Sequence, residues 1–147
     1  MMDEEQLLLE LHFPSQAEQL QAVRSEVRET MGKIGSLSCD INCAVIAINE
    51  ACMNIIQHAY GEHREGKIIL QVFDLGNDLL FRLIDFANPV DASKIKSRDL
   101  EDIKPGGLGV HMIHEVMDDC HFLKCPEGVG NIFQMRKRKT RSTENNK

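Results

Sequence analysis

The sequence has no long apolar run, no basic leader and no excess of positive charge. A membrane-spanning helix needs about 18 consecutive apolar residues, and no stretch of the 147 residues approaches that length. The start, MMDEEQLLLELHF, is acidic and its apolar run is short, which argues against a secretory signal. The net charge of −6 argues against general nucleic-acid binding. We therefore expect a cytoplasmic protein that contacts neither membrane nor nucleic acid.

Cysteine is present but forms no recognisable framework. The five cysteines are an odd number without a familiar spacing, which indicates reduced thiols rather than disulfides. A zinc site would have to combine Cys120, His121 and Cys125 with His111 or His114, and these spacings match no common ligand pattern. We expect no metal ion held by cysteine.

Length and composition fit one globular domain with a single site. An apolar fraction of 42% and a charged fraction of 27% are those of a soluble protein with a real core. A basic cluster, RKRKTR, runs into STENNK without apolar periodicity, so we expect a solvated tail there. The predicted domain covers residues 1–139, and the predicted disordered tail covers residues 140–147.

The first secondary-structure elements follow from the spacing of apolar residues. LLLELHF predicts a strand over residues 7–13. Ser15 and Glu18 then stand at the spacing of a capping box. Behind them an apolar stripe predicts an amphipathic helix: Leu20, Val23, Val27 and Met31.

The rest of the chain predicts an α+β fold. A second helix, apolar on most of its circumference, should run from near Ser38 or Asp40 to about Tyr60 in the core. GKIILQVFDL and LLFRLIDF, joined by GND, predict an antiparallel hairpin, and CHFLKC with NIFQMRKR predicts another. GVHMIHEVMDD predicts a short helix, and the long segment 87–107 before it is expected to be functional. Helices should pack on one face of a mainly antiparallel sheet.

Three polar residues interrupt the apolar second helix at every fourth position. Glu50, Asn54 and His58 would therefore lie along one side of it. A carboxylate inside a buried helix costs several kcal/mol unless it is paired or solvated at a site. An amide oxygen one turn on suits magnesium, which takes few protein ligands. The alternative is an exposed polar stripe without a function.

Two further segments carry weaker indications of chemistry. Asp85, in DFANPVD at a strand end, could accept an exocyclic amine while small Ala87 lets a flat ring approach, or it could simply initiate a turn. Gly106, Gly107 and Gly109 precede a helix, where glycines and free amides suit phosphate, or they form a plain entry loop. They do not match a P-loop, because no Gly-Lys-Ser/Thr follows.

Together these segments resemble a known family. NEACMNIIQHAY is similar to the N box, DFANP to the first glycine box and PGGLGVHMI to the second glycine box of the GHKL (histidine-kinase-like) ATPases. Within that superfamily the chain looks most like the anti-sigma factor serine/threonine kinases of bacterial partner-switching systems. The resemblance covers almost the whole chain and implies the two-layer α+β sandwich called the Bergerat fold.

The resemblance implies a role for each matching position. Glu50 would be the general base, Asn54 the magnesium ligand and Asp85 the adenine acceptor, with ATP and Mg²⁺ as the required small molecules. Segment 87–107 would be a lid over the phosphates. The implied ATP-binding residues are Asn54, Asp85, Ala87, Lys104, Gly106, Gly107, Leu108 and Gly109. His58 is interpreted as a packed core histidine.

Two positions depart from the family pattern. Ala87 stands where the first box usually has glycine, which keeps the site small but could tighten the adenine pocket. Asn131 stands where many relatives carry threonine. We expect both changes to leave nucleotide binding intact.

The resemblance also implies partners. It predicts a homodimer built from the first strand and helix, a sigma factor bound by the chain, and a small STAS-domain antagonist as the phosphorylated substrate. Arg24 lies where relatives use an arginine on the partner-binding surface, although it could be one solvated charge on an amphipathic helix.

Two other functions remain open from the sequence. An ATP-gated module could sequester a partner without transferring phosphate, but such a binder would not need Glu50 as a base. A detached histidine-kinase catalytic domain would need a separate helical hairpin with a phosphorylatable histidine, for which the chain has no room.

Overall fold

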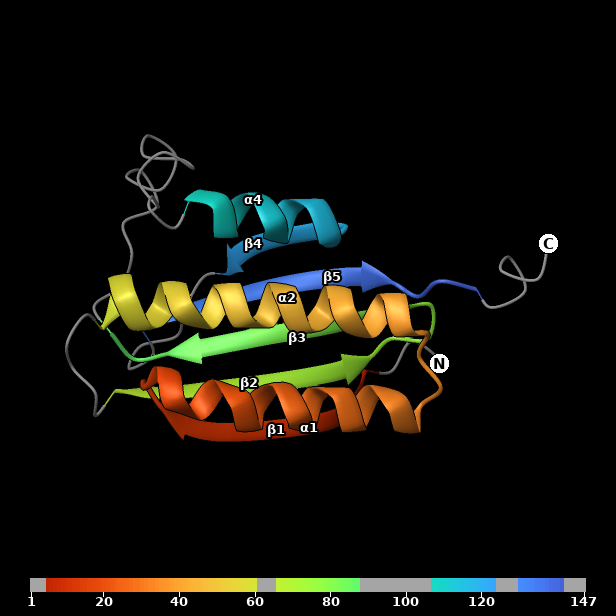
Figure 1. Ribbon diagram of the computed structural model, residues 1–147, viewed down its shortest axis with the longest axis horizontal. Coiled ribbons are helices and arrows are strands. Elements are labelled where there is room, and N and C mark those ends of the chain that lie inside the picture. Colours follow the sequence, from red (N-terminus) through yellow and green to blue (C-terminus); the bar gives the residue numbers. More distant parts are fainter. Residues whose placement is uncertain (1–4, 61–65, 88–106, 124–129, 142–147) are drawn as a thin grey trace.

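The computed structural model describes residues 5–60, 66–87, 107–123 and 130–141, with the side chains of 107–111 left out. They form one antiparallel sheet with helices on one face, so the predicted α+β architecture is confirmed (Figure 1). The strand order is β1-β2-β3-β5-β4. The elements are β1 Gln6–Pro14, η1 Ala17–Gln19, α1 Leu20–Lys33, α2 Ser38–Asn54, η2 Ile55–Ala59, β2 Lys67–Asp74, β3 Asp78–Asp85, α4 Gly107–Val116, β4 Asp119–Leu123 and β5 Asn131–Arg138.

The core lies between the helices and the sheet. Alternation along β2 and β3 turns every second side chain toward the helices, and the α1 stripe meets them from the other layer. The predicted stripe of α1 is confirmed, because its four residues are all buried. The largest side chains with no more than 1% exposure include Phe81, Met31, Ile48, Ile68, Leu70 and Met135.

Helix α2 is the central element of the helical layer. It packs between α1 and α4 across the sheet (Figure 1). With η2 it forms a continuous helix over Ser38–Ala59 whose length and mean hydropathy of 1.3 would suffice to cross a membrane. Its place in the core explains this apolar character, since helices packed on several sides are apolar around most of their circumference.

The start of the first helix differs from the prediction. A 3-10 turn, η1, precedes α1, and its N-cap is Gln16 rather than Ser15. The buried Ser15 hydroxyl makes no hydrogen bond in the described structure, so the predicted capping box with Glu18 is wrong. The backbone amide of Ser15 instead donates to Gly66 O at 2.7 Å, which ties the end of β1 to the start of β2.

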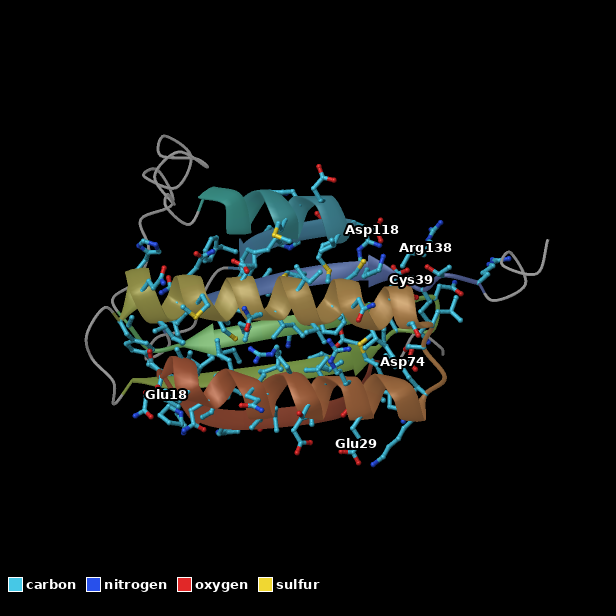
Figure 2. All side chains as sticks on the ribbon, viewed as in Figure 1. Glu18, Glu29, Cys39, Asp74, Asp118 and Arg138 are labelled. Carbon is cyan, nitrogen blue, oxygen red and sulfur yellow. The ribbon has the colours of Figure 1, made fainter. Side chains whose placement is uncertain are left out.

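The basic cluster at the end of β5 is ordered and neutralised rather than a frayed tail. Arg136 donates to Asp78 Oδ2 at 2.8 Å, and Lys139 donates to Asp74 Oδ1 at 2.8 Å. Asp74, Asp118 and Arg138 gather at this end of the molecule (Figure 2). These acidic partners offset part of the positive charge of the cluster.

The order continues past the predicted domain boundary at residue 139. The backbone amide and the hydroxyl of Thr140 donate to the two carboxylate oxygens of Asp40, at 2.8 and 2.7 Å. Asp40 is only 3% exposed and lies in the first turn of α2. The predicted tail thus begins after a residue that is anchored to the core, while residues 142–147 lie outside the described residues.

The sheet face turned away from the helices carries a polar row in its middle. Glu10, Gln71, Arg82, Gln134 and His121 are register partners across the five strands. Gln71 donates to Glu10 at 2.9 Å, and Arg82 donates to Gln134 at 3.0 Å. Cross-strand pairs of this kind stabilise the sheet where no helix covers it.

Candidate functional site

The segments with predicted chemistry converge at one end of the molecule. The C-terminal end of α2, the end of β3 and the start of α4 lie at the left of Figure 1, where β5 also begins. The charged cluster around Asp74 and Arg138 lies at the opposite end (Figure 2). The fold therefore brings together residues that are more than 50 positions apart in the sequence.

Glu50 and Asn54 occupy one side of α2, one turn apart. Both side chains are half-buried, which places them at the boundary of the core rather than inside it. Neither side chain makes a hydrogen bond or ion pair with another described residue. The carboxylate and the amide are thus available to a ligand, or they form the exposed stripe that the sequence left open.

His58 does not continue this stripe, and its interpretation as a packed core histidine is wrong. The helix changes from α to π geometry at Ile55, and Tyr60 N donates to Ile55 O at 3.0 Å. A π turn adds one residue to the helical turn. As a result His58 is exposed, and Tyr60 is buried five positions after Ile55.

Asp85 is a buried carboxylate held by two donors. The pleat of β3 turns it toward the helical layer, and it is 3% exposed. Ala87 N and Asn131 Nδ2 donate to its Oδ1, at 3.0 and 2.9 Å. Burial raises the pKa of Asp85 above its ordinary value, while the two hydrogen bonds oppose this shift. No described residue donates to Oδ2, so one oxygen remains for a ligand.

Asn131 and Ala87, the two positions expected to depart from the family pattern, both contact Asp85. The amide of Asn131 reaches the Asp85 carboxylate from β5, which is a role that a hydrogen-bonding side chain must fill at this buried position. Next to Ala87 the chain approaches Gly130 so closely that a Cβ at Gly130 would collide with the Ala87 carbonyl. Gly130 N also donates to Asp85 O at 3.0 Å, which joins β5 to the end of β3.

The second glycine box lies within the start of α4 rather than before it. Gly107, Leu108 and Gly109 belong to the first turn of the helix. The first four amides of an α-helix have no intrahelical acceptor and carry positive potential, so this turn can bind phosphate oxygens. Lys104, Gly106 and the predicted lid from residue 88 lie outside the described residues.

Arg24 links the first two helices close to Glu50. Its guanidinium donates to Asn49 Oδ1 at 2.7 Å, and the side chain is half-buried. Arg24 is therefore more than a solvated charge on an amphipathic helix. This contact was not predictable from the sequence, because no spacing rule connects residues 25 positions apart.

These residues fit an adenine nucleotide. A buried carboxylate with a free oxygen can accept the exocyclic amine, and the first turn of α4 can receive phosphates at the same end of the molecule. On α2, Asn54 offers a hard oxygen, which suits a magnesium ion that keeps most of its water. Glu50, one turn earlier and paired with no other described residue, could act as a base.

Comparison with protein families agrees with this site. Residues 13–137 match the model of the histidine kinase-like ATPase domain. The match includes every described site residue, from Arg24 to Asn131. The predicted resemblance is therefore confirmed at the level of the superfamily.

Among individual relatives, the chain is similar to serine-protein kinases named RsbW. It is 33% identical over 124 residues to that of Bacillus cereus (strain G9842), and 34% identical over 128 residues to that of Bacillus thuringiensis subsp. konkukian (strain 97-27). Both matches cover 78% of this chain and 76% of the relative.

The fold also matches a solved structure. The crystal structure of the RsbU and RsbW domains of Rv1364c from Mycobacterium tuberculosis aligns with a TM-score of 0.64 at 20% sequence identity. The alignment covers 90% of this chain and 33% of that longer chain, and it supports the two-layer fold. The chain belongs to the histidine kinase-like ATPase domain family and, within it, to the RsbW serine-protein kinases.

Proposed function

We propose that the protein is an ATP-dependent protein serine/threonine kinase and anti-sigma factor. The observation that carries this proposal is the buried Asp85 carboxylate at the end of β3. It lies at the same end of the fold as the C-terminal part of α2, which bears the half-buried Glu50 and Asn54, and the start of α4. Membership of the RsbW serine-protein kinases supports the same reaction. A pure binding module would need Asp85 and the α4 turn, but not a base at position 50.

Each residue has a separate task in the proposed reaction. Asp85 selects adenine by accepting its amine through Oδ2, because Oδ1 already accepts two hydrogen bonds. The backbone amides of Gly107, Leu108 and Gly109 hold phosphate oxygens. Glu50 accepts the proton of the incoming serine or threonine hydroxyl as the oxygen attacks the γ-phosphate. Lys104 is proposed to contact that phosphate.

A magnesium ion would neutralise phosphate charge in the transition state. Asn54 would hold it through the side-chain oxygen, with water and phosphate oxygens completing the shell. One protein ligand is enough for a magnesium ion that is bound mainly through its nucleotide.

The proposed partners are a sigma factor and a STAS-domain antagonist. Arg24 is assigned to the partner surface, and its bond to Asn49 would connect that surface to the residue beside Glu50. A homodimer built from β1 and α1 is also proposed. The support for it is that β1 forms an edge of the sheet and exposes Leu7, which is 48% accessible.

Phosphotransfer to a STAS-domain protein tests this function. ATP labelled on the γ-phosphate is incubated with the protein and candidate STAS partners, with and without a chelator of magnesium. We expect phosphoserine or phosphothreonine on one partner, and no transfer in the chelated reaction. Tight ATP binding without transfer to any candidate would favour the ATP-gated binding module, and labelled histidine would favour a histidine-kinase domain.

A further inference from the structure

The hydroxyl of Tyr60 is bonded to three backbone groups. It donates to Lys67 O at 2.7 Å, and it accepts from Phe86 N at 2.7 Å and from Lys67 N at 3.2 Å. A phenol has one hydrogen to donate and two lone pairs, so this hydroxyl is fully used. It connects the end of the second helix to the start of β2 and to the end of β3.

One of these bonds falls inside the segment that presents Asp85. Phe86 N lies between Asp85 and Ala87, whose amide donates to the carboxylate. From the other side β5 holds the same segment, through Gly130 N to Asp85 O and Asn131 Nδ2 to Asp85 Oδ1. The direction of the free Oδ2 thus depends on supports from both sides, and Tyr60 is the support that comes from the helix.

Two local features place Tyr60 for this contact. The π turn contains one more residue than an α turn, so that position 60 rather than 59 is the next after Ile55 to point into the core. The ring then lies against Gly66, where an added Cβ would come within 2.5 Å of Tyr60 Cδ1. Burial raises the pKa of Tyr60, which keeps its hydroxyl protonated as this network requires.

We propose that Tyr60 is a positioning residue for base selection, which fixes the backbone at Phe86 and thereby the direction in which Asp85 meets adenine. The proposal rests on the proposed function, in which Asp85 accepts the exocyclic amine. A tyrosine that only filled space would leave the choice of base unchanged when its hydroxyl is removed.

The test compares adenosine diphosphate with inosine diphosphate by titration calorimetry. Inosine carries a carbonyl oxygen in place of the amine, and a carboxylate rejects it. We expect the wild type to prefer adenosine diphosphate by at least about tenfold, as for a hydrogen bond to a charged group. Tyr60→Phe keeps the ring and should bring the ratio within about threefold. Both ligands are titrated into the same protein preparation, so a partly unfolded sample does not change the ratio of the two affinities.

Ser15→Ala is the matched control. It also removes a buried hydroxyl, from a residue bonded to Gly66, but this hydroxyl makes no hydrogen bond in the described structure. The ratio should stay at the wild-type value. Gly66→Ala displaces the Tyr60 ring without removing its hydroxyl and should lower the ratio as Tyr60→Phe does.

The outcomes separate this proposal from the proposed function. A wild-type ratio retained in Tyr60→Phe, even with both affinities reduced, would give Tyr60 a purely structural role and overturn the proposal. A wild type without preference would contradict the assignment of Asp85 itself. In that case Asp85→Asn would also leave the ratio unchanged.

Discussion

At the scale of single residues, Asp85, the proposed adenine acceptor, is costly for the stability of the fold. Its carboxylate is buried, and two hydrogen bonds to Oδ1 offset only part of the desolvation. Because the pKa of Asp85 is raised in the fold, the folded chain binds this proton more readily than the unfolded chain does. The charged form therefore lowers the free energy of unfolding at neutral pH.

Asp85→Asn should weaken nucleotide binding without lowering the stability of the fold. The amide can keep both hydrogen bonds at Oδ1 but presents a donor to adenine, so we expect affinity for adenosine diphosphate to fall at least about tenfold. The free energy of unfolding at pH 7 should be equal to or above that of the wild type. This advantage should shrink as pH falls through the raised pKa of the folded state, and it should be lost below the ordinary aspartate value of 3.8, where the wild-type carboxyl is protonated in both states.

Denaturant unfolding at several pH values, with calorimetry of nucleotide binding, measures both effects. If Asp85→Asn binds adenosine diphosphate with the affinity of the wild type, the assignment of Asp85 to the nucleotide site is wrong. An advantage in stability that grows as pH falls would contradict the raised pKa.

Sequence patterns singled out the candidate site residues more readily than the residues that support them. Asp85 and Glu50 stood out because a charged residue in an apolar segment needs a reason. Tyr60 and Asn131 act through contacts across the fold, and no local spacing predicts such contacts. His58 was misassigned because the stripe assumed α geometry, and the π turn shifts every later residue by one position.

At the scale of elements, the anchor between α2 and the end of β5 closes the helical layer onto the sheet. Thr140 satisfies both oxygens of Asp40, a buried carboxylate that would otherwise be costly. Lys137 Nζ lies 3.9 Å from the same carboxylate. Asp40 also stands in the first turn of α2, where negative charge is favourable.

Thr140→Val should destabilise the protein by about 1.5 to 3 kcal/mol, the range for a hydrogen bond to a charged group. Valine keeps the shape and the backbone amide but removes the hydroxyl. Urea unfolding of Thr140→Val, Asp40→Asn and the double variant forms a cycle that isolates the pair. Additive effects of the two substitutions would show that the hydroxyl and the carboxylate do not interact.

Strands and helices were predictable where one face is buried and the other is not. The alternation of β2 and β3 and the α1 stripe fixed these elements correctly. The predicted start of α1 was wrong, because a capping-box spacing does not exclude a 3-10 turn in front of the helix. The basic cluster RKRKTR was expected to run into a solvated tail, because the aspartate partners of Arg136 and Lys139 lie 58 and 65 positions away in the sequence.

At the scale of the whole molecule, the two ends of the sandwich have different roles. One end holds the end of β3 and the start of α4, which carry residues proposed to bind the nucleotide, and at the other end aspartates neutralise the basic cluster that begins in β5 (Figures 1 and 2). The antiparallel sheet makes this division possible, since β3 ends where β5 begins. The order of the motifs predicted the family, and the match to the histidine kinase-like ATPase domain confirmed the fold.

The central claim is that Glu50 is the base of a protein kinase, and single-turnover phosphotransfer to a STAS partner measures it most directly. Glu50→Gln should lower the rate by about 10² to 10⁴, the usual contribution of a general base, and leave the affinity for adenosine diphosphate within about threefold. Glu29→Gln, at an exposed position of α1, should transfer phosphate at the wild-type rate. An undiminished rate in Glu50→Gln would contradict the account.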